Sequence, residues 1–102
     1  MKELKDNPSM KKKFPEEHPA WIFSQSKTHY KAIHFTSHST THGEKNVKLK
    51  HNIDPREKTR PSYAVPYKEP RPKKDYQFSN IKYRIHKEDK AIVNSLKNKK
   101  RR

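Results

Sequence analysis

The sequence has 102 residues, a formal net charge of +15, one glycine, eight prolines and no cysteine. Leu, Ile, Val and Phe occupy only 16 positions, and so highly charged a chain with so few of these residues is expected to lack a core of its own. The absence of cysteine excludes disulfide bonds and thiolate metal sites, which often stabilise small proteins. The predicted fold class is therefore non-globular, with a partner ordering the chain.

The sequence contains no candidate membrane span or export signal. The longest apolar runs, 20–23 and 91–93, fall far short of the ~18 residues that cross a bilayer. The N-terminus mixes acidic and basic residues and has no apolar signal region. We therefore expect a soluble protein that is not exported and that has no membrane partner and no small-molecule substrate.

The first half of the chain divides into an arm and an extended segment. In residues 1–19, three prolines among charged residues leave no room for a helix or strand, which predicts an arm. In residues 20–54, Trp21 and Phe23 alternate with other residues as in a strand, and so do Ile33 and Phe35, around a turn-like stretch at 24–28. Short extended pieces are predicted here, with one edge strand at most at 47–50.

The second half is rich in proline, tyrosine and basic residues. Five prolines between positions 55 and 72 favour polyproline II or irregular chain across 55–86 and are incompatible with a central strand. Ile81, Tyr83 and Ile85 alternate with basic residues, which predicts a short half-buried strand. Residues 87–102 are predicted to form one short helix, from about 87 to 97, followed by a basic tail.

The sequence does not indicate catalysis or metal binding. His34, His38 and His42 lie four residues apart, but they would form a zinc site only on a helix. The hydroxyl and β-branched residues between them disfavour that helix, so polar packing is the preferred interpretation. Gly43 is expected to mark a turn with positive φ. Without a glycine-rich phosphate loop or a rigid nucleophile and base, we expect no enzyme, no cofactor and no metal.

Aromatic and basic side chains are interleaved along the chain, which suggests contact with a partner. Nucleic acid would accept the cations on its phosphates and the rings against its bases. An acidic protein surface would accept the aromatic rings in pockets and the arginines on its carboxylates. The expected aromatic anchors are Trp21, Phe23, Tyr30, Phe35, Tyr63, Tyr67, Tyr76, Phe78 and Tyr83. The expected electrostatic contacts are Arg56, Arg60, Arg71, Lys73, Lys74, Arg84, Arg101 and Arg102.

The short, basic, cysteine-free chain, with the tyrosine- and proline-containing sequence YAVPYKEP at 63–70, resembles the small microtubule inner proteins of ciliary and flagellar doublets. The resemblance implies a structural, non-enzymatic protein that lies along the lumenal wall between tubulin protofilaments, contacts neighbouring axonemal proteins and stabilises the axoneme. It also implies a location in the cytoplasm, in the cytoskeleton of a cilium or flagellum.

A second interpretation is a ribosomal or other RNA-binding protein threaded through rRNA. It rests on the net charge of +15 and on the basic residues at 97–102. Only six of the 26 basic residues are arginine, the favoured side chain for bidentate phosphate contacts, which counts against it. A third interpretation, a basic nuclear or chromatin-associated peptide, rests on residues 97–102 alone.

Overall fold

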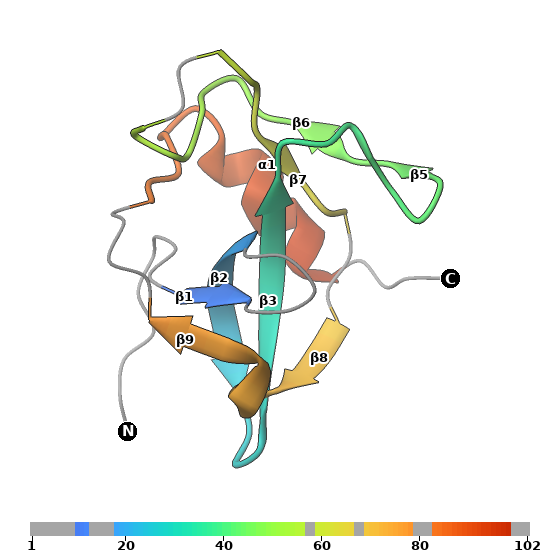
Figure 1. Cartoon of the computed structure of the whole chain (residues 1–102), viewed down its shortest axis with the longest axis vertical. Helices are drawn as coiled ribbons and strands as arrows, with labels where there is room; N and C mark the ends of the chain where they lie inside the picture. Colours follow the sequence, from blue (N-terminus) through green and yellow to red (C-terminus); the bar gives the residue numbers. More distant parts are fainter. Residues whose placement is uncertain (1–9, 13–17, 57–58, 67–68, 79–82, 99–102) are drawn as a thin grey trace.

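A hairpin of two eight-residue strands lies at the centre of the computed structural model, which describes residues 10–12, 18–56, 59–66, 69–78 and 83–98 (Figure 1). Strands β2 (His18–Gln25) and β3 (His29–Thr36) pair antiparallel, with Trp21 opposite Ile33. Between them, Ser26 Oγ accepts the backbone N–H of His29 at 3.1 Å. The turn therefore falls within the turn-like stretch predicted at 24–28.

The other strands extend this hairpin into a seven-stranded antiparallel sheet. β3 is paired along both edges: β2 lies on one side, and β8 (Glu69–Pro72) and β7 (Tyr63–Ala64) share the other. Beyond β2 lie β1 (Met10–Lys12) and then β9 (Tyr76–Phe78), and β6 (Val47–Lys48) pairs with β7. A separate two-stranded sheet joins β4 (Thr40–Thr41) and β5 (Glu44–Lys45).

Three short helical segments complete the described chain. The 3₁₀ turn η1 (Lys73–Asp75) leads into β9, and α1 (Lys90–Ser95) continues into the 3₁₀ turn η2 (Leu96–Asn98). α1 lies behind β3 in Figure 1 and falls within the range predicted for the helix, although it is shorter. Among the described residues, no helix has the length and apolar character that a membrane crossing requires.

Both faces of the β2–β3 hairpin are buried. One face packs against the loops and the C-terminal helical segments, in a cluster formed by Trp21, Ile33, Phe35, Leu49, Ile53, Ala64, Ile85, Val93 and Leu96. The other face packs against β9, in a cluster formed by Ala20, Ile22, Ala32 and Tyr76. Because side chains alternate between the faces of a strand, the run at 20–23 is apolar throughout: each of its faces meets a core cluster.

The prediction of a non-globular, mostly irregular and extended chain is wrong. The Cα radius of gyration is 12.6 Å, where a folded chain of about 100 residues has about 13 Å and an unfolded one about 30 Å. The prediction considered Leu, Ile, Val and Phe, but the core also uses Trp21, Tyr76 and Tyr83, and large aromatic side chains bury about 150–250 Å² each. Fully buried alanines allow the strands and loops to approach closely: Ala20, Ala32 and Ala64.

The proline-rich region contributes two strands to the sheet. β7 pairs with both β3 and β6. The prediction of irregular chain across 55–86 did not include this strand. β8 contains Pro70 and Pro72 and pairs with β3. Proline has no backbone N–H group, and it is tolerated in an edge strand because the outer edge of such a strand needs no hydrogen-bond donors. Tyr83 and Ile85 are buried but lie outside any strand, and the rest of the strand predicted there falls outside the described residues.

A buried carboxylate joins α1 to the loop after β6. The Asp89 side chain is fully buried and accepts the backbone N–H groups of Lys50 at 2.9 Å and His51 at 3.0 Å. The Asp89 carbonyl oxygen accepts the N–H of Val93 at 3.0 Å, in the first turn of the helix. One residue therefore fixes the loop, the start of the helix and their distance from each other.

We predict that Asp89→Ala lowers the free energy of unfolding by about 2–4 kcal/mol, because it removes a fully buried side chain and leaves two partly buried backbone N–H groups without their acceptor. Urea denaturation followed by circular dichroism measures this change. The matched control is Glu88→Ala, which removes a neighbouring carboxylate that is half exposed and should cost less than about 1 kcal/mol. Equal losses in the two variants would contradict the role assigned to Asp89.

Candidate functional site

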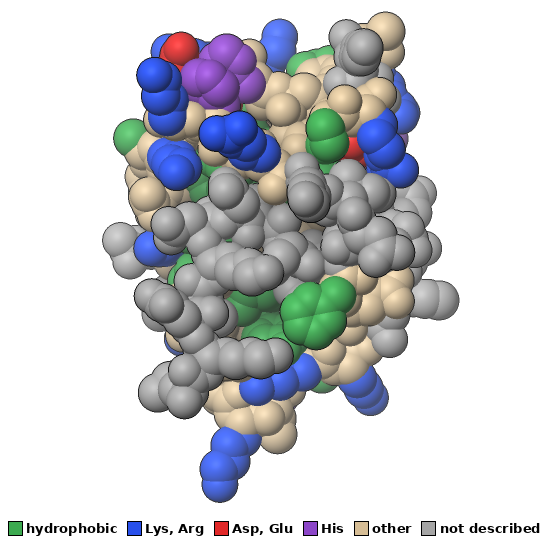
Figure 2. Space-filling view, turned by 90° about the vertical axis from the view of Figure 1, so that its left-hand side faces the viewer, with side chains coloured by type: hydrophobic (Ala, Val, Ile, Leu, Met, Phe, Trp, Pro, Cys, Tyr) green, Lys and Arg blue, Asp and Glu red, His purple; other side chains and the backbone are tan. Residues whose placement is uncertain are grey.

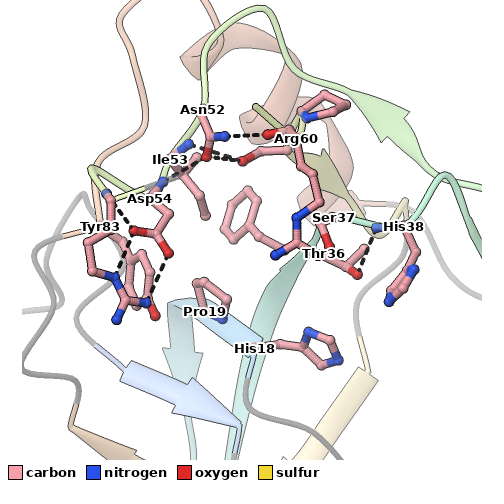
Figure 3. Close-up of a pocket in the computed structure, with 14 residues that line it drawn as sticks. His18, Pro19, Thr36, Ser37, His38, Asn52, Ile53, Asp54, Arg60 and Tyr83 are labelled. Carbon is pink, nitrogen blue, oxygen red and sulfur yellow. Dashed lines mark hydrogen bonds and ion pairs between the residues drawn. The ribbon is translucent and has the colours of Figure 1, made fainter. Parts of the chain in front are cut away.

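A polar cavity of about 290 Å³ lies between the start of β2, the end of β3 and the loop at 52–62, of which residues 52–56 and 59–62 are described (Figure 3). Its polar lining includes His18, Thr36, Ser37, His38, Asp54 and Arg60. In Figure 3 the Arg60 side chain extends into the cavity towards Thr36, while His18 and His38 lie along its edge. Three separate segments of the chain therefore bring cationic, imidazole and hydroxyl groups to one place.

The loop that carries Arg60 is closed by a hydrogen-bond network around Asn52. Asn52 Oδ1 accepts Ser62 Oγ–H at 2.7 Å and the Asp54 N–H at 3.0 Å, and its amide group donates to the Arg60 carbonyl oxygen. Ser62 Oγ in turn accepts the Ile53 N–H at 3.1 Å. Asn and Ser side chains suit this role because they satisfy backbone groups that no strand pairs. The network fixes the backbone of Arg60 at the edge of the cavity.

A second asparagine holds the loop that carries His38. Asn46 Nδ2 donates to the His38 carbonyl oxygen at 3.0 Å and to Thr41 Oγ1 at 2.7 Å, across the β4–β5 turn. The His38 N–H donates to Thr36 Oγ1 at 3.2 Å. In that turn His42 and Gly43 have φ of 50° and 80°, so the expected positive-φ turn at Gly43 is confirmed. These hydrogen bonds fix the backbone N–H and carbonyl groups of His38.

The charged lining of the cavity is positive in formal charge. It contains two arginines and one carboxylate, and that carboxylate, Asp54, accepts Arg56 Nε at 3.2 Å and Arg56 Nη2 at 3.1 Å. Arg60 adds a second guanidinium group, and His18 and His38 add positive charge when they are protonated. Guanidinium, imidazole and hydroxyl donors together are the groups that bind oxyanions such as phosphate.

An adjoining cavity of about 200 Å³ shares His18, Thr36 and His38 with the first. It adds His34, His42 and Arg71, so the three histidines spaced four apart do gather around one hollow, although they come from a strand, a loop and a turn. His34 makes a polar packing contact, as the preferred interpretation of these histidines predicted. Its ring stacks on Tyr76 with centroids 5.8 Å apart, and its Nε2 lies 2.8 Å from the Tyr76 hydroxyl.

The expected aromatic anchors are mostly parts of the fold. Trp21, Phe35, Tyr76 and Tyr83 are buried in the chain's own core, although Phe35 and Tyr83 also border the polar cavity. Three further rings are partly buried: Phe23, Tyr30 and Tyr63. Phe78 is 70% exposed, and Tyr67 lies outside the described residues. Burial in the core therefore accounts for much of the aromatic content that suggested a contact surface.

The expected cationic contacts are scattered over the molecule. Arg56 and Arg60 line the polar cavity and Arg71 the adjoining one, where it also lies 3.7 Å from Asp75. Lys73 Nζ donates to Gln25 Oε1 at 3.0 Å and sits 5.1 Å from the centre of the Tyr30 ring. Lys74 and Arg84 are exposed away from these cavities, and Arg101 and Arg102 lie outside the described residues.

One group of possible metal ligands occurs among the described residues. Ligand atoms of His51, His86 and Glu88 lie within 4.8 Å of one another. The two rings are stacked, with centroids 3.6 Å apart and planes 23° apart, and His86 Nδ1 accepts the Glu88 N–H at 3.1 Å. Nearly parallel rings do not aim their lone pairs at a common ion, whereas His51 Nε2 lies 3.6 Å from Glu88 Oε2. The geometry suits a stacked pair beside a carboxylate better than a metal centre.

The sequence did not point to several residues of the polar cavity. His18 lies within the arm predicted at 1–19, and that prediction is wrong where it left no room for a strand, because β1 (Met10–Lys12) and the start of β2 fall in this range. Only the pairing of β2 brings His18 towards the loop at 52–62. Asn52 and Ser62 are separated by ten positions, and their contact depends on how that loop closes. Comparisons of the chain with protein-family models, with curated proteins and with solved structures find no match. The cavity itself is therefore the main guide to function.

We predict that Ser62→Ala opens the loop that holds Arg60, because it removes the acceptor of the Ile53 N–H and a donor to Asn52. The free energy of unfolding should fall by about 1–3 kcal/mol, and hydrogen exchange at the Ile53 and Asp54 amides should become faster. Ser39→Ala, at an exposed position, is the matched control and should leave both unchanged. Unchanged exchange in Ser62→Ala would contradict the network.

Proposed function

We propose that the protein binds single-stranded RNA and holds one phosphodiester group in the polar cavity. The observation that carries this proposal is the cavity lining, in which two arginines, two histidines and the hydroxyl side chains of Thr36 and Ser37 meet one carboxylate that is already paired. Guanidinium groups form paired hydrogen bonds with phosphate oxygens, and hydroxyl groups can donate to the remaining ones.

The distribution of charge supports a polyanionic partner. The chain carries a net charge of +15, and Lys and Arg side chains are spread over the upper and lower parts of the face in Figure 2, with few acidic side chains among the described residues there. Such a surface attracts nucleic acid from a distance and contacts phosphates along a strand. The low share of arginine is then no obstacle, because lysines supply the general attraction and Arg60 the specific contact.

The shape of the site favours a single strand over a duplex. The described residues contain one α-helix, α1, which has six residues and packs against the core, so they offer no helix for the major groove. An open-sided cavity of about 290 Å³ instead suits a backbone that can bend and present one phosphate group. Single-stranded RNA has that flexibility, and its 2′-oxygen atoms can accept hydrogen bonds from Thr36 and Ser37.

The resemblance to microtubule inner proteins stays a prediction, as do the ciliary location and the tubulin partner. An extended chain that touches several tubulin subunits was its physical basis, and the chain is compact. Four of the aromatic side chains expected to anchor it lie in the core. RNA binding needs neither an extended chain nor those rings, and for that reason we prefer it. Threading through rRNA, as the second interpretation had it, also required an extended chain and is not part of the proposal.

We predict that Arg60→Ala weakens binding of a single-stranded RNA oligomer about tenfold or more. Hydrogen bonds to charged groups contribute about 1.5–3 kcal/mol, and 1.4 kcal/mol is a factor of ten in affinity. Fluorescence anisotropy at several salt concentrations measures both the affinity and its salt dependence. The slope of log affinity against log salt should fall by about 0.7 for each lost phosphate contact.

The matched control is Arg84→Ala, which removes an exposed arginine that lies outside both cavities described above. It should change the affinity by much less than Arg60→Ala. Two results would contradict the proposal: no RNA binding by the unmodified protein at physiological salt, or equal losses in the two variants. The second result would indicate general attraction by the basic surface without a specific cavity.

A further inference from the structure

We infer that the polar cavity also cleaves the RNA, by attack of a ribose 2′-hydroxyl group on the adjacent phosphodiester. The inference rests on the proposed function, since the cavity must first hold the phosphate. What points beyond binding is the choice of residues: two imidazole groups and a guanidinium group line a single cavity of about 290 Å³. Imidazole groups can bind phosphate, but unlike a guanidinium group they are also general acids and bases.

The two histidines reach the cavity from different elements. His18 is the first residue of β2 and pairs across the sheet with Lys12 of β1. His38 follows β3 and is held through its own N–H and carbonyl groups by Thr36 and Asn46. In Figure 3 they lie along the same edge of the cavity, with the Arg60 side chain extending between the loops above them. Both rings and the guanidinium group therefore border the space in which we place the phosphate.

The reaction balances with these groups alone. One imidazole accepts the proton of the 2′-hydroxyl group as O2′ forms a bond to phosphorus. The bond between phosphorus and O5′ of the next nucleotide breaks, and the other imidazole, in its protonated form, donates a proton to that oxygen. The products are a 2′,3′-cyclic phosphate and a 5′-hydroxyl end. The Arg60 guanidinium group stabilises the negative charge that develops on the phosphorane oxygens.

We expected no enzyme because the chain offers no activated nucleophile and its composition suggested no rigid scaffold. This chemistry avoids the first requirement, and the fold meets the second. The nucleophile belongs to the substrate, so the protein needs no activated serine, cysteine or lysine. Positioning needs a rigid scaffold, and the sheet with its two asparagine-centred networks supplies one, although the composition had suggested no core. Thr36 and Ser37 line the same cavity and can orient the phosphate oxygens through their hydroxyl groups.

The experiment incubates the full-length protein, in buffer containing EDTA, with a single-stranded RNA oligomer of mixed sequence labelled at its 5′ end. We expect fragments that carry a 2′,3′-cyclic phosphate, identified by mass spectrometry. The same sequence as DNA or as 2′-O-methyl RNA should stay intact, because neither has the nucleophile. Binding to the 2′-O-methyl oligomer is measured in parallel, because it reports the proposed function without cleavage.

Single substitutions assign the cleavage to this cavity. His18→Asn, His38→Ala and Arg60→Ala should each lower the rate, by about 10²–10⁴-fold for a general acid or base and about 10²–10³-fold for the charge-stabilising group. Free imidazole should restore part of the rate of His38→Ala, since this side chain is exposed and a small base can enter the vacated space. A purely structural histidine would show no such rescue.

The matched control is His29→Asn, which changes a histidine at the opposite end of β3 from His38, with its Nδ1 2.8 Å from Thr28 Oγ1. Its rate should equal that of the unmodified protein. Two outcomes overturn the inference and leave RNA binding standing: Arg60-dependent binding of the 2′-O-methyl oligomer with no cleavage of RNA, or cleavage that persists unchanged in His18→Asn and His38→Ala. Failure of the 2′-O-methyl oligomer to bind would remove the inference and the proposed function together.

Discussion

The fold depends on the burial of both faces of the β2–β3 hairpin. A basic chain with few aliphatic residues cannot build two separate layers, so this hairpin places one row of side chains in each of two core clusters. Trp21 and Ile33 face the C-terminal helical segments, and Ile22 and Ala32 face Tyr76. Burial stabilises the fold by about 25 cal/mol for each Å² of apolar surface removed from water. Because both faces of the hairpin are buried, this term offsets much of the conformational entropy that the chain loses on folding, which the composition had suggested it could not do.

The polar cavity follows from the same arrangement. Phe35 is the last core residue of β3, which ends at Thr36, and the chain turns away directly afterwards. The residues at this turn, Thr36 to His38, are polar and line the cavity. The loop at 52–62 returns over the same end of the sheet, anchored by the buried Ile53 and by Ser62. The core and the proposed site therefore adjoin each other: Phe35, Ile53 and Tyr83 are buried residues that also border the cavity, and histidine, arginine and hydroxyl groups form its polar lining.

Local features of the fold were predictable from the sequence, and its long-range features were not. The alternation at Trp21 and Ile33, the turn between them and the conformation of Gly43 are all set by neighbouring residues. The burial of Asp89 and the contact of Asn52 with Ser62 depend on residues brought together from distant positions. The aromatic residues were read as contacts with a partner because composition does not distinguish an exposed ring from a buried one. His38 drew attention through its spacing, whereas His18 and Arg60 join it only through the tertiary fold.

The measurement that tests the account most directly is an ¹H–¹⁵N correlation spectrum of the full-length protein, recorded without RNA and then during titration with a 2′-O-methyl RNA oligomer. The account predicts the wide dispersion of amide shifts typical of a packed β-sheet, with RNA-induced changes concentrated at residues 36–38 and 52–62. A narrow spectrum would contradict the compact fold. A dispersed spectrum whose changes fall away from these two loops would contradict the cavity as the RNA site.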